Sequence, residues 1–164
     1  MPISFEIPER IKQNLQMTEA LAKGVMRPEA RMLDENEHQR PETFIKMTWP
    51  IVREQQKRTL DKLAARSAGE APPREGPGIR MLDMICTFEM LSWGDVGQML
   101  CMPTALLAGA AIEAVGTPEQ QERFLRRYAE GDAPVWGAMA MTEPGAGSDT
   151  SAIQTTAVLD ETTN

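Results

Sequence analysis

The fold is indicated first by residues 117–131, which read TPEQQERFLRRYAEG. Thr117 is a favourable helix N-cap, Pro118 fits the first helical position, and Gln120 stands where a capping box requires it. Gly131 is a natural C-terminal stop. The apolar stripe of this stretch consists of Phe124, Leu125 and Tyr128. These signals predict an amphipathic helix that packs one face on a core.

The chain before this helix predicts further helices. Apolar residues recur at three- and four-residue steps through residues 7–25, and Pro28 is expected to kink or end that helix. Residues 43–66 predict a second helical region, which Pro50 disturbs. Residues 67–78 are rich in proline and glycine and predict a long loop.

Residues 79–115 are strongly apolar. Residues 79–91 predict a short helix that ends at the Trp-Gly-Asp sequence of residues 93–95. Residues 96–115 are apolar almost all round, so we expect a helix buried between other helices. The 12 methionines of the chain concentrate in and around these segments. They are expected to fill the core, and the alternative is an adaptable wall for an apolar ligand.

The character of the chain changes after Pro134. Residues 135–142 are short, apolar and uninterrupted, which predicts a buried strand, and residues 153–159 alternate like a second strand. A turn rich in Pro, Gly and Ser separates them at residues 143–149. The predicted fold class is therefore mainly α, an orthogonal or up-down bundle of about five to six helices followed by the first strands of another domain.

Composition excludes several classes of protein. The chain of 164 residues has 24 acidic and 17 basic side chains and a net charge of −7, which argues against a dedicated nucleic-acid binder. Two cysteines cannot build a disulfide framework and suggest a reducing compartment, so we expect a cytoplasmic location. Residues 1–10 show no secretion signal, and residues 99–115 are too interrupted for a membrane span.

The best candidate for ligand chemistry is residues 142–149. Gly145 and Gly147 permit the positive φ angles that turn successive N–H groups toward one point, and Ser148 adds a hydroxyl donor. Such a nest would suit a phosphate or pyrophosphate, and a plain hairpin loop is an equally good interpretation. Glu143 is also one of two carboxylates, with Glu113, whose surroundings could raise the pKa.

Two other patterns carry weaker signals. One histidine and two separated cysteines lack any metal-ligand spacing, so no metal site is expected. The second helical region is locally basic, and its cations are Arg53, Lys57, Arg58, Lys62 and Arg66. A solvated helix face is the favoured interpretation of these cations, and an anion site is the alternative.

Residues 140–152, which read AMTEPGAGSDTSA, resemble the first signature of the acyl-CoA dehydrogenases, and the similarity continues through residues 153–157. Residues 116–125, GTPEQQERFL, resemble the helix that leads into this signature in that family. The resemblance implies an N-terminal helical domain, here residues 1–133. Residues 134–164 would then be the start of a truncated middle domain, a β-barrel-like one, and a C-terminal four-helix domain would complete the enzyme.

The resemblance also implies an activity. In the family that this sequence resembles, a base removes the α proton of an acyl-CoA thioester while the β hydride moves to FAD, as in the β-oxidation of fatty acids. An electron-transfer flavoprotein then accepts the electrons, and the enzyme is a homo- or hetero-oligomer. The catalytic base would belong to the C-terminal domain, so the resemblance assigns no catalytic residue to this chain. The 164 residues alone are expected to be inactive.

The resemblance assigns binding residues one by one. The FAD contacts would be Met139, Met141, Thr142, Gly147 and Ser148. The acyl-CoA contacts would be Ser148, at the pantetheine arm, and Met99 and Met102, at the acyl cavity.

Two alternatives remain open. The chain could be a non-catalytic helical module that binds an acyl chain or a protein partner, which a stable monomer without an exposed apolar patch would favour. It could also be part of an oxidase-type flavoprotein, in which oxygen accepts the electrons.

Overall fold

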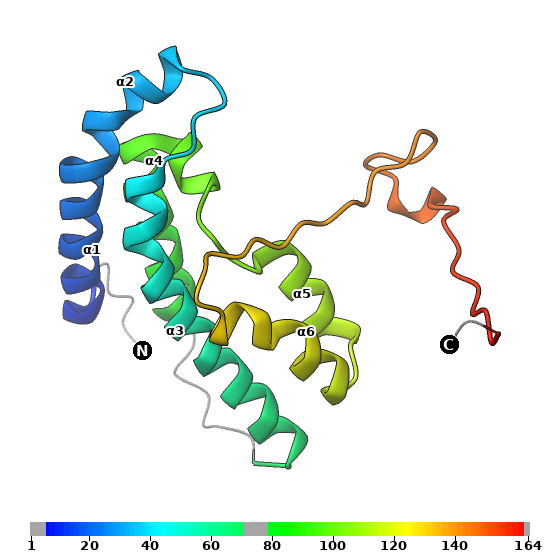
Figure 1. Cartoon of the computed structure of the whole chain (residues 1–164). Helices are drawn as coiled ribbons and strands as arrows, with labels where there is room; N and C mark the ends of the chain where they lie inside the picture. Colours follow the sequence, from blue (N-terminus) through cyan, green and yellow to red (C-terminus); the bar gives the residue numbers. More distant parts are fainter. Residues whose placement is uncertain (1–5, 71–78, 163–164) are drawn as a thin grey trace.

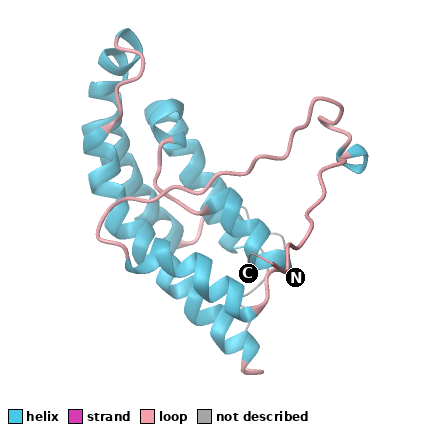
Figure 2. Ribbon diagram, turned by 45° about the vertical axis from the view of Figure 1, so that its right-hand side comes forward, coloured by secondary structure: helices cyan, strands magenta, loops and turns pink. Residues whose placement is uncertain are grey.

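The structure, a computed structural model, describes residues 6–70 and 79–162. The described part of the chain is mainly α-helical, which confirms the helical part of the predicted class (Figure 2). Its α-helices are α1 (Glu9–Leu21), α2 (Arg27–Glu35), α3 (Glu42–Ser67), α4 (Ile79–Leu100), α5 (Leu106–Val115) and α6 (Pro118–Glu130). Most of the predicted loop at 67–78 lies outside the described residues, and α3 ends where that loop was expected to start.

Helix α3 is the central element of the bundle (Figure 1). It packs along α6, while α1 and α4 pack on each other and α5 packs on α6. Two clusters of buried side chains result. The first cluster consists of Ala22, Met26, Phe44 and Leu91, and the second consists of Leu63, Ala105, Leu125 and Tyr128. Each half of α3 therefore contributes to a different core.

The first helical run shows how the chain accommodates Pro28. A π-helical turn (Ala22–Met26) follows α1 directly, and α2 continues from it with Pro28 in its first turn. Proline has no N–H to donate, so a regular helix would also lack a hydrogen bond from residue 28. The wider π-helical turn before Pro28 therefore loses no bond at that residue. The disturbance that we predicted at Pro28 is thus a π-helical turn.

The expected break at residues 93–95 is confirmed in the backbone. Asp95 has extended angles, φ −175° and ψ 117°, within a run that is otherwise helical on both sides. Its Oδ1 accepts the N–H of Gln98 at 2.7 Å, which is the bond of an N-cap. The side chain of Gln98 is buried and donates to the Met26 carbonyl at 2.8 Å. The kink therefore directs an amide from α4 into the π-helical turn.

The expectation of one buried helix over residues 96–115 is wrong. The chain leaves the helix after Leu100, and Pro103, whose ring cannot continue the preceding hydrogen bonds, separates α4 from α5. Gly109 of α5 is buried near Leu125 of α6. The opposite side is open, because α6 covers one face only, and Leu107 is 57% exposed.

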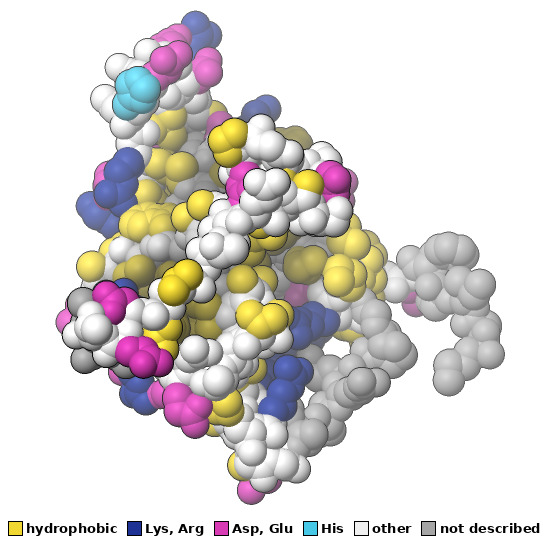
Figure 3. Space-filling view, turned by 90° about the vertical axis from the view of Figure 1, so that its right-hand side faces the viewer, with side chains coloured by type: hydrophobic (Ala, Val, Ile, Leu, Met, Phe, Trp, Pro, Cys, Tyr) yellow, Lys and Arg dark blue, Asp and Glu magenta, His cyan; other side chains and the backbone are white. Residues whose placement is uncertain are grey.

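Apolar side chains are exposed on α4 and α5. They are Ile79, Met81, Leu82, Met84, Ile85, Phe88, Trp93, Val96, Leu100, Leu106, Leu107 and Val115. Figure 3 shows hydrophobic side chains exposed among polar ones on the side of the molecule that lies on the right in Figure 1. No helix within the described ranges is long and apolar enough to cross a bilayer.

The chain beyond α6 forms no β-strand among residues 131–162. It contains an isolated bridge between Glu143 and Ala146 and one 3-10 turn (Thr150–Ala152). Figures 1 and 2 show this part of the chain leaving the helices. The strands predicted at 135–142 and 153–159 are absent here, since a strand is stabilised by pairing and these residues have no neighbouring strand.

Candidate functional site

Gly137 fixes the point at which the chain leaves the helices. Its N–H donates to the Thr104 carbonyl at 2.9 Å. A Cβ at this position would lie 2.9 Å from the Ala108 Cβ and 3.0 Å from the Tyr128 hydroxyl. Only glycine allows so close an approach, because any side chain would overlap with α5 and α6. The segment that follows therefore starts from a fixed position on the helical bundle.

Trp136 strengthens this anchor. Its indole Nε1–H donates to the Cys101 carbonyl at 2.9 Å, and the Arg40 guanidinium carbon lies 4.8 Å from the centre of its ring. This arrangement is a cation–π contact. A cavity of about 350 Å³ lies beside it and is lined by Arg40, Pro41, Ile45, Leu100, Cys101 and Trp136. The junction between bundle and segment thus combines a close backbone contact with a stacked aromatic ring.

Beyond the anchor, residues 143–146 form a tight turn. The N–H of Glu143 donates to the Ala146 carbonyl at 2.9 Å, and the N–H of Ala146 donates back to the Glu143 carbonyl at 3.1 Å. Ala146 is buried beneath the turn. Neither Gly145 nor Gly147 has a positive φ, since Gly69 is the described glycine with that conformation. The predicted nest of N–H groups is therefore wrong in this form, and the turn is closed by pairing across its ends.

The Glu143 carboxylate ties the turn to the chain that follows. It accepts the N–H groups of Gln154 and Thr155, each at 2.9 Å, and the Thr155 hydroxyl. The Thr155 hydroxyl and then these N–H groups lower the pKa of Glu143, because they stabilise the charged form. The surroundings of Glu143 thus lower its pKa, where the sequence suggested a rise.

Asp149 organises the short 3-10 turn. Its Oδ1 accepts the N–H of Ser151 at 3.2 Å and also the Ser151 hydroxyl. An Asp that bonds the backbone two residues later is a common local motif, and the Asp-Thr-Ser sequence was its signal. Local bonds therefore give residues 143–155 a definite shape. Sequence reasoning missed the parts that Glu143, Asp149 and Thr155 play in it.

The residues expected at FAD are accessible. Met139 is 38% exposed and Met141 49% exposed, and Thr142, Gly147 and Ser148 are exposed as well. No atom lies within 4 Å of the position that a Cβ on Gly147 would take. A flat ring or a phosphate group can approach this backbone without displacing protein atoms.

The two residues expected at the acyl cavity lie elsewhere. Met99 and Met102 are half-buried and pack against the first core cluster, at the end of α4 and in the turn after it. The structure does not bring them to the segment that carries Ser148, which projects from the bundle (Figure 1). Their assignment stays a prediction.

Metal ligands do not gather within residues 6–70 and 79–162. No group of three or more His, Cys, Asp or Glu side chains there is placed to hold an ion. His38 lies on the surface after α2, with φ 73°.

Comparison with known proteins shows a similarity to one family. Residues 71–132 match the family model of the acyl-CoA dehydrogenase N-terminal domain. In this N-terminal portion the chain is similar to the acyl-CoA dehydrogenases. The match ends just after α6, so it covers α4, α5 and α6 and stops before the anchor at Gly137. Members of this family are flavoprotein oxidoreductases.

Individual relatives extend the similarity. The probable medium-chain specific acyl-CoA dehydrogenase 2, mitochondrial, of Caenorhabditis briggsae is 28% identical over 158 residues, which are 93% of this chain and 34% of that protein. Acryloyl-CoA reductase (NADH) of Anaerotignum propionicum is 47% identical over 70 residues, 39% of this chain and 17% of its own. The caffeyl-CoA reductase-Etf complex subunit CarC of Acetobacterium woodii is 37% identical over 81 residues, 49% and 21% of the two chains.

The chain spans about a third or less of the length of these relatives. No solved structure matches it.

Proposed function

We propose that this chain is the N-terminal part of an FAD-dependent enzyme that removes hydrogen from the α and β carbons of an acyl-CoA thioester. The observation that carries the proposal is the match to the acyl-CoA dehydrogenase N-terminal domain over residues 71–132. Residues 139–152, most of which belong to the signature AMTEPGAGSDTSA, lie a few residues beyond this match and follow the anchor at Gly137. The division into a helical domain at 1–133 and a β domain from 134 belongs to the same proposal.

The exposed groups of residues 139–148 fit a flavin cofactor. The backbone of Met141 and the hydroxyl and backbone of Thr142 offer hydrogen bonds to the edge of a flat ring, and Met139 lies beside it. The N–H of Gly147, whose backbone is open to solvent, and the hydroxyl of Ser148 offer individual donors to a pyrophosphate. FAD, when bound, accepts the hydride. The chain's own contribution is to hold and orient it from a fixed anchor.

The acyl-CoA substrate would meet different residues. Ser148 would contact the pantetheine arm, and the thioethers of Met99 and Met102 would line the acyl cavity. Thioether side chains are flexible and polarizable, which suits a wall that accepts an acyl chain. The catalytic base is proposed to lie outside these 164 residues, in a C-terminal domain.

Partners are part of the proposal. An electron-transfer flavoprotein would accept the electrons, which is supported by the relative that is named as a subunit of an Etf complex. Exposed apolar side chains on α4 and α5 support a larger assembly, a homo- or hetero-oligomer, because such a surface is normally covered. A role in fatty-acid β-oxidation and a cytoplasmic location stay predictions.

The same surface argues against the alternative of a self-contained, non-catalytic module. That alternative is favoured by a monomer without an exposed apolar patch, and α4 and α5 expose one. The oxidase alternative differs only in the electron acceptor and shares the proposed cofactor residues.

A chimaera tests the proposal. Residues 1–164 would replace the matching part of the Caenorhabditis briggsae relative, and the purified protein would be assayed for bound flavin and for acyl-CoA oxidation with an artificial electron acceptor. We expect a yellow protein that is bleached by acyl-CoA. The chain of 164 residues by itself is expected to be colourless, because its candidate cofactor residues are exposed. A folded, colourless chimaera that ignores acyl-CoA would refute the proposal.

A further inference from the structure

A cavity of about 500 Å³ lies between α1, the C-terminal half of α3 and the start of α4. Its lining residues are Arg10, Arg58, Asp61, Lys62 and Arg80. Four of these five side chains are cationic, in a chain whose net charge is −7. None of them belongs to the candidate flavin or acyl-CoA site.

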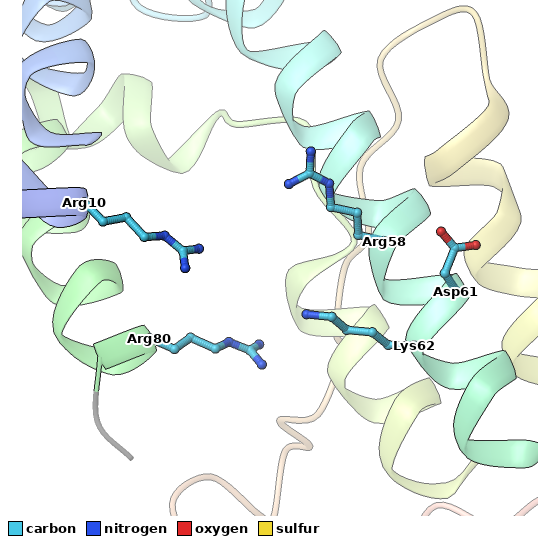
Figure 4. Close-up of a pocket in the computed structure, with 5 residues that line it drawn as sticks. All are labelled: Arg10, Arg58, Asp61, Lys62 and Arg80. Carbon is cyan, nitrogen blue, oxygen red and sulfur yellow. The ribbon is translucent and has the colours of Figure 1, made fainter. Parts of the chain in front are cut away.

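The cations face one another across the cavity (Figure 4). Arg10 and Arg80 extend from α1 and α4 on one side, and Arg58 and Lys62 extend toward them from α3, while Asp61 points away. Like charges that line one cavity repel one another, and that repulsion is relieved when an anion lies between them. The arrangement therefore favours an anionic occupant.

Carboxylates within the described residues compensate little of the charge of Arg58, Lys62 and Arg80. Lys62 and Arg80 have no ion pair there, and Arg58 has one at its edge, with its Nε 3.8 Å from the Glu54 Oε1. Exposed pairs of that kind contribute little. The cavity retains a positive field.

The backbone adds to this field. Helix α1 begins at Glu9 and α4 begins at Ile79, each one residue before an arginine of the cavity. Unpaired N–H groups give the start of a helix a partial positive charge. The start of α1 therefore adds a partial positive charge near Arg10.

A solvated helix face does not account for this arrangement. That interpretation explains Arg58 and Lys62, which follow one side of α3, but not why two further arginines from other helices point at them. Arg10 lies roughly fifty residues before Arg58 and Lys62 in the sequence, and Arg80 lies roughly twenty residues after them. No sequence pattern therefore indicated that these side chains meet. Tertiary packing of α1 and α4 creates it.

We propose that this cavity binds a phosphate-bearing ligand of about the size of a diphosphate. Two guanidinium forks match phosphate oxygens in pairs, and the lysine supplies a compact third charge. The shared chemistry is a doubly or more highly charged phosphate group. A soluble diphosphate and the headgroup of an anionic phospholipid both supply it.

Calorimetric titration of the 164-residue chain tests the site, with inorganic pyrophosphate at low ionic strength as the probe. We expect saturable binding that weakens with added salt. Lys62→Ala and Arg80→Ala should each weaken it about tenfold or more, since each removes charge-assisted hydrogen bonds. These side chains are exposed, so the variants keep their helical circular dichroism.

Two control variants distinguish this cavity from general charge effects and from the proposed flavin site. Lys46→Ala removes an exposed cation of the same helix outside the cavity and should leave the affinity unchanged. Gly147→Val should leave it unchanged as well, because residue 147 lies in the segment proposed to hold the flavin.

A second titration distinguishes the two sources of the phosphate group. It uses phosphatidylcholine vesicles with and without phosphatidic acid. Binding to the acidic vesicles that is lost in Lys62→Ala supports a headgroup as the source. Binding of pyrophosphate alone supports a soluble diphosphate.

The proposal is overturned if neither pyrophosphate nor acidic vesicles bind. It is also overturned if Lys46→Ala weakens binding as much as Lys62→Ala, because the effect would then be one of general charge. Loss of pyrophosphate binding in Gly147→Val alone would assign that binding to the other site.

Discussion

The helical body, residues 9–130, and the C-terminal segment, residues 138–162, are built on different principles. The body buries side chains contributed by distant parts of the chain, such as Phe44 and Leu125. The segment is shaped by bonds between near neighbours, as between Glu143 and Thr155, and it exposes Leu159 to 72%. The body can therefore specify its own fold, whereas the segment has a local shape without a core.

This difference separates stability from cofactor chemistry. The signature that resembles the acyl-CoA dehydrogenases lies mostly in the segment, and the family model matches within the body. Substitutions in the body should change the free energy of unfolding. Substitutions in the segment should change flavin binding in the chimaera and leave the unfolding of the helices nearly untouched.

The largest expected effect is that of Leu125→Ala. Leu125 is fully buried in the second core cluster, so the variant loses about 2–5 kcal/mol of stability through the cavity that it leaves. The matched change in the segment, Leu159→Ala, should cost less than about 0.5 kcal/mol. Urea unfolding followed by circular dichroism measures both. Equal losses would show that the segment shares the core of the body.

The junction between the two regions is tested by Gly137→Ala. The added methyl group would lie 2.9 Å from the Ala108 Cβ, and relieving that overlap is expected to cost about 1–3 kcal/mol. Gly145→Ala is the control, because no atom lies within 4 Å of its new methyl group. The same unfolding measurement applies. If both variants unfold at the same urea concentration as the parent, the anchor does not exist in solution.

Thr117→Ala tests the local signal at the start of α6. The Thr117 hydroxyl accepts the N–H of Gln120 at 3.3 Å, while the Gln120 side chain accepts the N–H of Thr117 at 2.9 Å. Loss of this capping box should cost about 1 kcal/mol, and Thr117→Ser should restore most of it. Thermal unfolding of the three proteins gives the comparison. A serine variant as unstable as the alanine variant would contradict a role for the hydroxyl.

The smallest effect concerns pH and the segment alone. The pKa of Glu143 is lowered, so at pH values above the ordinary Glu pKa its carboxylate is charged and accepts the N–H groups of Gln154 and Thr155. This contribution is lost as the pH falls through the lowered pKa. The amide resonances of residues 154 and 155 should therefore shift in a pH titration, with a midpoint below the ordinary Glu pKa. They should lose this titration in Glu143→Gln, while the resonances of α6 stay in place. A titration midpoint at a pH above the ordinary Glu pKa would contradict the hydrogen bonds assigned to Glu143.

Local chemistry made parts of the body predictable. The capping box at Thr117, the helix expected at 43–66 and the break at 93–95 all follow from short-range rules, and the structure confirms them. The prediction of a single buried helix over 96–115 is wrong, because Pro103 interrupts the helix. The apolar residues of this stretch show no helical periodicity that could have indicated the break. Burial depends on neighbours, and α5 has too few to cover it.

The candidate site was less predictable than the body. The composition of residues 142–149 indicated a turn, but glycine permits a positive φ without requiring one, and Gly145 and Gly147 do not adopt it. Pairing partners decide whether residues 135–142 form a strand, and a local pattern cannot supply them. The meeting of Arg10 and Arg80 with Lys62 depends on helix packing, which no short motif encodes.

The central claim is that residues 139–148 hold the flavin while the helices hold the fold. Its most direct test is the flavin-to-protein ratio of the chimaera carrying Gly147→Val, compared with Gly145→Val. Both side chains enter open space in this structure, so neither should alter the unfolding of the helices. The account predicts that Gly147→Val loses the flavin and that Gly145→Val, at the tip of the turn, retains it. Full flavin content in Gly147→Val, with the helices intact, would contradict the account.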